Sequence, residues 1–359
     1  MLLLTLVGVT LLFALAEENG TLEALARRFL GALRDPRFVP PLIFILGALL
    51  SGIGPGAVPA TALMAPLAMA IGLKSGASAF LIALMIANGA NAGNLSPLSA
   101  VGIVARDGMA KAGLVGHEGK VFFANFIAHV IVGLVAWLWL RPRRIESAEA
   151  ASKVAEIAPL NRAQWLTTTV LTLWIVGTIY ASLPVGFAAF AAASVLILAR
   201  GADESAAIRR IPWSVILMVT GMTTLVSVLE KTGGMDLVTT LLASFASSST
   251  VNATVAFVTG LISTWSSTSG VVMPAFLPTS TSLAQRVGGD PLAVALSINV
   301  GSSLVDVSPL STIGALCVAA VTDPEVSRRL FRQMMIWGLS MTLVGALLCA
   351  LFAGPLARS

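Results

Sequence analysis

Apolar residues form long runs along the whole chain, and short polar segments separate these runs. The runs are about 16–22 residues long, which is the length of α-helix that crosses about 30 Å of hydrocarbon. This pattern predicts an all-α polytopic membrane protein. The expected spans lie at 1–16, 77–105, 121–140, 165–180, 185–200, 213–230, 290–320 and 331–352.

Two further apolar segments are divided by polar tips into arms of about 12 residues, which are too short to cross a membrane. The first segment covers 39–72 and has a Gly/Pro-rich tip at 51–59. The second covers 252–285 and has a Ser/Thr-rich tip at 263–270. Irregular backbone at membrane depth is tolerated where protein or a wet cavity surrounds it. We therefore expect two re-entrant helical hairpins; the alternative is a Pro/Gly kink within a continuous span.

The tetrapeptide Ser-Pro-Leu-Ser occurs twice, at 96–99 and at 308–311. The same offset of 212 residues relates Gly89 to Gly301. Each copy lies within a long apolar segment, where it would interrupt the helix. Interrupted apolar segments in matching positions of two halves are typical of transporters built from inverted repeats, whose binding sites lie at these interruptions.

The repeat divides the chain into a first inverted repeat at 1–140, a linker at 141–164 and a second inverted repeat at 165–359. Four spans lie between the two interrupted helices, so the second repeat is expected to run through the membrane in the opposite direction. The spans at 165–180 and 185–200 have no counterpart in the first repeat. We therefore expect the first repeat to lack its first two helices.

Lys and Arg are distributed unequally over the loops. The loops at 17–38, 141–164, 200–212 and 321–332 hold 15 of them, and the loops on the other side hold 5. By the positive-inside rule the first group, including the linker, is cytoplasmic and the C-terminus is outside, as in a bacterial inner membrane. Residues 21–35 have an apolar face opposite arginines, which predicts an amphipathic helix lying in the membrane interface.

The composition excludes several classes of function. The chain is 57% hydrophobic and 11% charged, so its net charge of +5 reflects loops of a membrane protein and does not indicate a nucleic-acid partner. No Walker motif, HExxH motif or catalytic acid pair is present, so we expect neither an enzyme nor ATP hydrolysis. Cys317 and Cys349 are interpreted as buried hydrophobic residues. His129 is interpreted as a packed helix-interface residue, with a proton relay as the alternative.

Interrupted helices suit ion and anion binding. Unwound carbonyl groups can bind Na⁺, and the next half-helix presents N–H groups and a positive dipole end to a carboxylate. The polar residues of the interruptions are therefore the candidates for the site. The substrate candidates are Asn91, Asn94, Ser96, Ser303 and Ser308, and the candidates for a Na⁺ site are Asn88, Ser99, Asp306 and Ser311.

Asp306 is the one carboxylate in the middle of an expected span, which makes it a functional candidate that either ligates a cation or carries a proton. We expect each interruption to meet the hairpin tip of its own repeat and both to face one cavity near the middle of the membrane. The alternative is that these polar residues only hold helices together. No cofactor is expected other than a coupling ion.

With these features the chain resembles the ion-transporter superfamily, and within it the MatC-type dicarboxylate (malonate) carriers, which are relatives of the divalent anion–sodium symporters. The resemblance rests on the interrupted helices, on Pro66-Leu67-Ala68 and Pro278-Thr279-Ser280 at the hairpins, and on residues 4–10 and 19–21. It implies an elevator-type carrier that forms a homodimer. It also implies that the second tip holds the substrate carboxylate through Ser267, Thr268 and Ser269, whereas the first tip departs from this pattern.

We therefore expect a secondary active transporter that moves a small organic dianion, a C3–C4 dicarboxylate such as malonate or succinate, across the lipid bilayer with Na⁺ or H⁺. One alternative is an exporter of an inorganic oxyanion or metalloid from the same superfamily. Another is a membrane subunit of a larger complex that has no transport cycle of its own.

Overall fold

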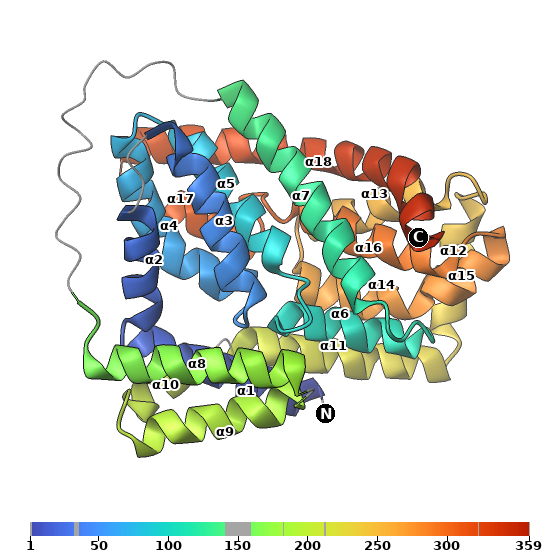
Figure 1. Cartoon of the computed structure of the whole chain (residues 1–359). Helices are drawn as coiled ribbons and strands as arrows, with labels where there is room; N and C mark the ends of the chain where they lie inside the picture. The colour runs from blue at the N-terminus through green and yellow to red at the C-terminus, as the bar shows by residue number, and fades with distance from the viewer. Residues whose placement is uncertain are drawn as a thin grey trace.

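The structure is a computed structural model that describes residues 2–31, 36–140, 159–181, 183–211, 213–321 and 323–358, and every regular element in these segments is a helix (Figure 1). The all-α prediction is confirmed. The first half contains α1 (Leu2–Glu18), α2 (Thr21–Gly31), the 3₁₀ turn η1 (Pro36–Phe38), α3 (Val39–Gly52), α4 (Ala57–Lys74), α5 (Ala79–Gly93), α6 (Ala100–Lys111) and α7 (Glu118–Leu140).

The second half begins with three helices. These are α8 (Arg162–Tyr180), α9 (Val185–Leu198) and α10 (Glu204–Arg210). The rest of the half contains α11 (Trp213–Lys231), α12 (Gly234–Ser244), α13 (Val251–Ser263), the π-helix η3 (Thr268–Val272), α14 (Met273–Phe276), the 3₁₀ turn η4 (Leu277–Thr279), α15 (Ser280–Val287), α16 (Pro291–Val305), α17 (Thr312–Ala319) and α18 (Pro324–Arg358).

The helix interruptions lie where the sequence predicts them. The first hairpin tip (51–59) separates α3 from α4, and the second hairpin tip (263–270) separates α13 from η3. The helices of the repeated tetrapeptides are broken at 94–99 and 306–311, which we call the first and second breaks. The second arm of the second hairpin is less regular than expected, because prolines at 274 and 278 divide it into short helical pieces.

Eight spans are expected, and two of them, 77–105 and 290–320, are expected to be interrupted; their number stays a prediction. Among the described residues, α7 and α18 are the helices long and apolar enough to cross a membrane alone. A third candidate is the pair α1 and α2, which is bent by 69°. Other expected spans are shorter or broken: α9 has 14 residues, which is about 21 Å at 1.5 Å per residue.

The loops group at two ends of the molecule as the expected topology requires. Figure 1 shows α2, α10 and the start of α18 at one end, and α12 with the C-terminus at the other. Which end faces the cytoplasm stays a prediction. Residues 141–158 of the predicted linker lie outside the described residues, and α8 begins at Arg162; the bounds of the linker stay a prediction.

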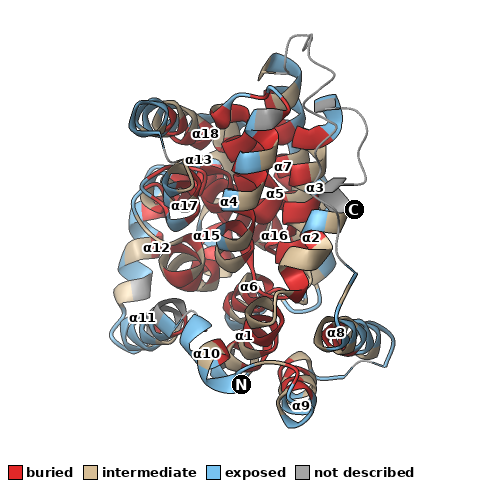
Figure 2. Ribbon diagram, turned by 90° about the vertical axis from the view of Figure 1, so that its left-hand side faces the viewer, coloured by how far each residue is buried: buried red, intermediate tan, exposed pale blue. Residues whose placement is uncertain are grey.

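The two broken helices form the centre of the structure. Every residue from Leu81 to Gly93 in α5 and from Leu292 to Val305 in α16 is buried. Figure 2 shows that exposed residues gather instead on the outer helices, such as α8, α9 and α11. In a membrane protein an exposed apolar helix face contacts lipid, so the central position of α5 and α16 places their polar groups among protein.

Glycines at equivalent positions let the helices of each half approach closely. A Cβ atom on Gly89 would lie 2.3 Å from the Phe44 carbonyl oxygen, and a Cβ atom on Gly301 would lie 2.5 Å from that of Ala256. The two pairs are related by the same 212-residue offset as the tetrapeptides. The α3–α5 packing of the first half therefore recurs as α13–α16 packing in the second half.

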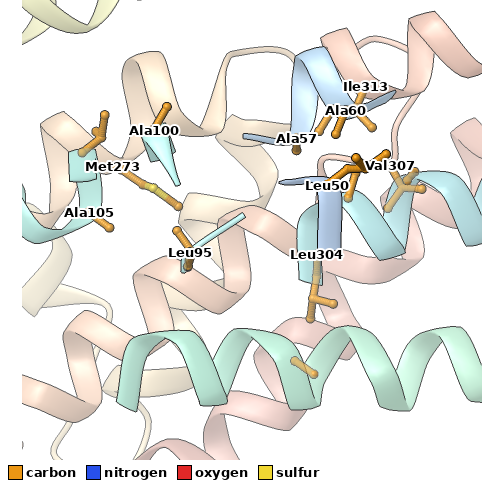
Figure 3. Packing of buried hydrophobic residues seen from close by; sticks show 14 of the residues in the cluster. Leu50, Ala57, Ala60, Leu95, Ala100, Ala105, Met273, Leu304, Val307 and Ile313 are labelled. Atoms are coloured by element: carbon orange, nitrogen blue, oxygen red, sulfur yellow. The ribbon is translucent and has the colours of Figure 1, made fainter. Parts of the chain in front are cut away.

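The two halves also exchange contacts around the hairpins. Helix α4 packs against α17, and α14 packs against α6. Figure 3 shows Ala57 and Ala60 of the first hairpin beside Ile313, and Met273 of the second hairpin near Ala100. Each hairpin therefore contacts the half-helix that follows the other half's break, which brings both breaks into one region.

Helix α1 lies against the helix pair α8–α9. A Cβ atom on Gly8 would lie 2.7 Å from the Gly186 carbonyl oxygen, and the Asn19 amide donates hydrogen bonds to the Thr167 hydroxyl (2.7 Å) and the Gly201 carbonyl (2.9 Å). The pattern Gly-x-Thr at 8–10 recurs at 221–223, and a Cβ atom on Gly221 would meet none of the described atoms within 4 Å. The two halves thus differ at this point. The expectation that the first repeat lacks two helices stays a prediction.

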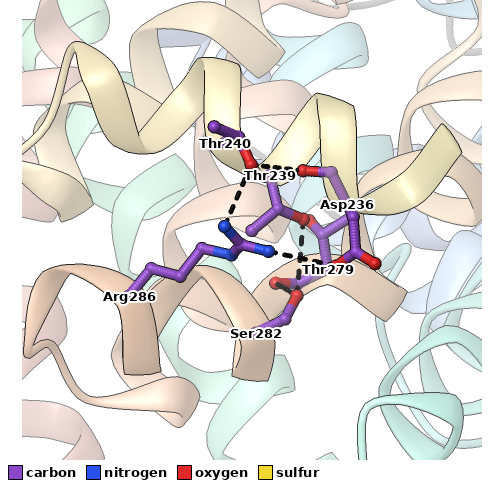
Figure 4. A network of polar contacts seen from close by, with 6 residues as sticks. All are labelled: Asp236, Thr239, Thr240, Thr279, Ser282 and Arg286. Atoms are coloured by element: carbon purple, nitrogen blue, oxygen red, sulfur yellow. Dashed lines mark hydrogen bonds and ion pairs between the residues drawn. The ribbon is translucent and has the colours of Figure 1, made fainter. Parts of the chain in front are cut away.

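A polar network joins the outer ends of α12 and α15 (Figure 4). The Arg286 guanidinium forms an ion pair with Asp236 (3.1 Å) and donates to the Thr240 hydroxyl (3.0 Å). The Thr239 and Ser282 hydroxyls lie 3.4 Å apart. This network is partly exposed, so it is worth little in free energy, but it ties the end of the second hairpin to α12.

Candidate functional site

The first break and the first hairpin tip are joined by two hydrogen bonds. The Ala57 backbone N–H donates to the Asn94 side-chain oxygen (3.0 Å), and the Ala100 backbone N–H donates to the Gly54 carbonyl oxygen (2.9 Å). Gly56 has φ +85°, a conformation that favours glycine, and a Cβ atom there would lie 3.5 Å from the Asn94 oxygen. The Gly/Pro composition of this tip thus permits close contact with the break.

Polar side chains of α7 reach the same region, and sequence reasoning did not find one of them. The Asn125 amide donates to the Asn91 carbonyl oxygen (2.6 Å), and His129 Nδ1 lies 3.1 Å from the Asn88 side-chain oxygen. Asn125 and His129 lie one helical turn apart and are both fully buried. That spacing of two polar residues on an apolar span is the signal that could have identified Asn125. His129 packs at a helix interface, as interpreted from the sequence.

Several buried polar atoms around the first tip and first break have no hydrogen-bond partner among the described residues. They are the Ser51 and Ser99 hydroxyls, the Thr61 hydroxyl and the Asn91 amide nitrogen. A buried polar group without a partner costs about 1–3 kcal/mol. These four groups flank the first tip and the first break, so this region keeps hydrogen-bonding capacity for a ligand.

The second break carries the carboxylate. Asp306 is 8% exposed, the Ser311 hydroxyl donates to its backbone carbonyl oxygen (2.7 Å), and the Ser311 and Thr268 hydroxyls lie beside its carboxyl group. Thr268 belongs to the second tip, and its hydroxyl also contacts Ser263 and lies 3.3 Å from the Ser302 carbonyl oxygen. The second tip therefore meets the second break through hydroxyl groups, as the first tip meets the first break through Asn94.

The remaining candidates of the second half have separate roles. The Ser267 hydroxyl accepts a hydrogen bond from the Gly270 backbone N–H (3.0 Å), and Ser269 is half-buried. Thr268 alone of these three has a contact with the break among those described. The Ser303 hydroxyl is buried without a partner in the described part of the chain. The Ser308 hydroxyl accepts from the Leu310 N–H (3.3 Å), as Ser96 does from Leu98 in the first break (3.3 Å).

The equivalent serines Ser99 and Ser311 differ in their contacts. The Ser311 hydroxyl lies 2.7 Å from the Asp306 and Ser308 carbonyl oxygens and accepts from the Gly314 N–H (3.3 Å), which caps α17. The Ser99 hydroxyl makes none of these contacts and has no partner among the described residues. At the first break this hydroxyl is free to contact a ligand. At the second it is part of the protein's own structure.

The described cavities lie on either side of the first hairpin and first break. One of about 20 Å³ is lined by Glu17, Pro55 and Arg210 among others, and one of about 10 Å³ by Leu95 and Arg106 among others. Each has room for about one water molecule. Neither joins the two breaks, so the shared cavity for substrate stays a prediction.

A cation near Asp306 would be held by a particular set of atoms. Within the described segments, no three His, Cys, Asp or Glu residues come together as a metal-binding group. Asp306, the Thr268 and Ser311 hydroxyls and the backbone carbonyls of the break are oxygen donors, which hard cations prefer. This donor set fits a hard monovalent cation or a proton better than a transition metal.

The described chain is all-helical, its outer faces are apolar, and its two central helices are broken at buried polar groups. These features are typical of a polytopic membrane transporter. The model of the citrate transporter family CitMHS matches residues 1–299, and the chain belongs to this family. None of the curated proteins compared with the chain matches it significantly.

The family assignment settles the broad class of function. The family lies within the ion-transporter superfamily, so that part of the sequence-based resemblance is confirmed, and the chain is an integral membrane protein. It belongs among secondary transporters of citrate-like anions, which is a family of transporters and not of enzymes. The narrower resemblance to MatC-type malonate carriers stays a prediction.

Proposed function

We propose that this protein carries a small organic anion with two or more carboxylates across the membrane together with Na⁺ or H⁺. In this proposal the first break binds the anion and the second break binds the coupling cation. The observation that carries the proposal is the difference between equivalent residues: the amide Asn94 meets the first tip, and the carboxylic acid Asp306 lies beside Thr268 of the second tip.

The first break has the chemistry that a carboxylate needs. It contains no acidic side chain, and the Asn91 amide and Ser99 hydroxyl there have donor capacity left over. Helix α6 begins directly after Ser99, so its N-terminal N–H groups and positive dipole end add to the attraction for an anion. Asn94 is held by the first tip, so movement of that hairpin would change the site.

The second break has the opposite chemistry. A buried carboxylate at membrane depth costs at least about 2.5–3.5 kcal/mol, which favours a cation or a proton beside Asp306. The hydroxyls of Thr268 and Ser311 supply further oxygen atoms. In the proposal, Asp306 binds the cation and Thr268 closes the second tip over it. The other sequence-derived candidates, Asn88, Ser96, Ser267, Ser269, Ser303 and Ser308, line the two breaks and tips around these groups.

We further propose that the two halves are inverted repeats that alternate access as an elevator-type carrier, in a homodimer. The equivalent glycine contacts at Gly89 and Gly301 and the reciprocal packing of α4 on α17 and of α14 on α6 support a two-fold relation between the halves. If the halves are related in this way, each half can adopt the conformation of the other. Exchange of the two conformations opens the binding site of an inverted-repeat carrier first to one side of the membrane and then to the other.

The substrate is tested by uptake into proteoliposomes that contain the purified chain. Labelled citrate, malonate and succinate would be offered separately, with inorganic phosphate as an oxyanion control, under an imposed Na⁺ gradient or an imposed pH gradient. We expect at least one carboxylate to accumulate above its external concentration under one gradient. If no carboxylate enters faster than into protein-free liposomes, the proposal is wrong; if only phosphate accumulates, the substrate is an oxyanion.

A further inference from the structure

The N-terminal end of α18 extends beyond the part of the helix that a membrane covers. Helix α18 has 35 residues, which is about 52 Å at 1.5 Å per residue and exceeds the roughly 40–45 Å of a bilayer with its headgroups. It runs along one edge of the molecule (Figure 1). Its apolar part, 334–355, is about 33 Å long and matches the hydrocarbon core, so residues 324–332 lie at headgroup level or beyond.

One face of α18 is exposed over its whole length. On the apolar part this face consists of Ile336 (66% exposed), Leu343 (66%) and Leu347 (60%) among others. Arg332 and Arg328 precede Ile336 by one and two helical turns, are exposed, and therefore continue the same face. The apolar face contacts lipid tails, because the opposite face packs against the protein. The arginines are thus placed where the lipid headgroups lie.

These arginines lack the acidic partners that Arg27 and Arg210 have. Arg27 pairs with Glu23 (2.7 Å) and Arg210 pairs with Glu17 (3.0 Å), whereas no ion pair joins Arg328, Arg329 or Arg332 to a carboxylate among the described residues. The Asp323 carboxylate near the helix start is already engaged, because it accepts hydrogen bonds from the Glu325 and Val326 N–H groups at 2.8 and 3.0 Å. Arg328 Nε donates to the Pro324 carbonyl (3.3 Å), which leaves its charge uncompensated, so three exposed guanidinium groups without a described ion pair form a basic patch within five residues.

We propose that this basic patch (Arg328, Arg329 and Arg332) binds the headgroup phosphate of an anionic phospholipid. Guanidinium groups make bidentate hydrogen bonds to phosphate oxygens, and their position at the end of a lipid-facing helix face brings them to the headgroups. Arginines near an anionic membrane surface strengthen binding by about fivefold each. The inference concerns lipid binding alone and does not depend on the identity of the transported anion.

The bound lipid would hold the helix that supports the second break. Gly338 lies about two turns after Arg332, and a Cβ atom on it would lie 2.9 Å from Ser308 Cα. The helix backbone therefore packs directly against the second break. A phospholipid bound at the start of α18 would steady this helix against the break, which connects lipid composition to the cation site of the proposed transporter.

The test is a titration of the detergent-solubilised full chain with dioleoylphosphatidylglycerol or dioleoylphosphatidylcholine, followed by native mass spectrometry. We expect the unmodified protein to bind phosphatidylglycerol more tightly than phosphatidylcholine. The double variant R328Q/R332Q should weaken phosphatidylglycerol binding by on the order of 30-fold. R328K/R332K, which keeps the charge, should retain most of the binding and shows that these positions tolerate substitution.

The control variant R27Q/R210Q removes the same number of positive charges, but from arginines that already have acidic partners. It should leave phosphatidylglycerol binding within about twofold of the unmodified protein, because those charges are neutralised locally. Equal binding of both lipids by the unmodified protein, or equal losses in R328Q/R332Q and R27Q/R210Q, would overturn the proposal. Because the readout is lipid binding, a failure here leaves the transport proposal untouched, and the reverse also holds.

Discussion

The first and second breaks share one backbone design and differ in their chemistry. In each, a serine begins the tetrapeptide and accepts a hydrogen bond from the leucine two residues later. In each, a glycine follows closely on the first serine of the tetrapeptide. A Cβ atom on Gly102 would lie 1.9 Å from the Ser96 carbonyl oxygen, and a Cβ atom on Gly314 would lie 2.1 Å from the Ser308 carbonyl oxygen. The backbone is therefore fixed in the same way twice.

The chemistry differs at two equivalent positions. The first break has Asn94 and a Ser99 hydroxyl without a partner, and the second has Asp306 and a Ser311 hydroxyl engaged within the protein. Repeated geometry with unequal charge suits a carrier that binds two ligands of opposite charge at once. The following predictions test whether the difference in charge, and not only the shared backbone, assigns the two roles.

The largest effect is expected from Asn94→Asp. Aspartate can still accept the hydrogen bond from Ala57, so the tip contact is kept, but the site gains a negative charge. Two like charges about 4 Å apart at an effective dielectric constant of about 20 repel by roughly 4 kcal/mol, which is nearly a thousandfold in affinity. Binding of the labelled anion to purified protein measures this. Unchanged binding would remove the first break from the anion site.

Asp306→Asn should leave anion binding possible and shift its dependence on the coupling cation to higher cation concentrations. A hydrogen bond to a charged group is worth about 1.5–3 kcal/mol, so cation affinity should fall by about 10- to 100-fold. The measurement is the initial uptake rate as a function of Na⁺ concentration and, separately, of pH. The matched control is Asp290→Asn, which also replaces a carboxylate by an amide but at the N-cap of α16. An unaltered ion dependence in Asp306→Asn would reduce Asp306 to a structural residue.

Gly102→Ala and Gly314→Ala test the shared backbone. Because the new Cβ atom would overlap the Ser96 or Ser308 carbonyl oxygen, each change should cost about 1–3 kcal/mol of unfolding free energy. Thermal unfolding of the purified protein gives the loss for each variant, and Gly354→Ala, with open space around it, serves as the control. A clear loss in only one of the two variants would contradict the structural equivalence of the breaks.

The smallest effects separate Ser99 from Ser311. Ser311→Ala removes the cap of α17 and should cost about 1 kcal/mol of unfolding free energy. Ser99→Ala removes a hydroxyl without a partner, so stability should be unchanged while anion affinity falls by about five- to tenfold, the value of one hydrogen bond. Equal stability losses in both variants would show that Ser99 also serves the protein's own structure.

The helix interruptions could be predicted because their causes are local. Gly, Pro, Ser and Asn within an apolar run disfavour a continuous helix, and the second copy of each pattern provided an independent check. The tips at 51–59 and 263–270 and both breaks were found in this way. The broad class of membrane transporter followed from the same features and agrees with the family assignment.

The other features of the site depend on contacts between segments that are far apart in the sequence. The local sequence pattern holds no information on these contacts. Asn125 of α7 donates to the Asn91 carbonyl oxygen of α5, and Thr268 of the second tip lies beside Asp306 of the second break. Helix α10 was expected to be a loop, because its seven residues are too short for a periodic apolar pattern; it forms with Asp203 as its N-cap and packs against α1. Helix ends were less predictable, because apolar run length does not show where a helix ends; α9, expected over 185–200, ends at Leu198.

The most direct test of the opposite roles of the two breaks is an electron cryomicroscopy structure of the purified protein with its transported anion and a saturating coupling cation. The account predicts density for the anion within hydrogen-bond distance of Asn91, Asn94 and Ser99, together with closure of the oxygen ligands around Asp306. Anion density beside Asp306, with none at the first break, would contradict it.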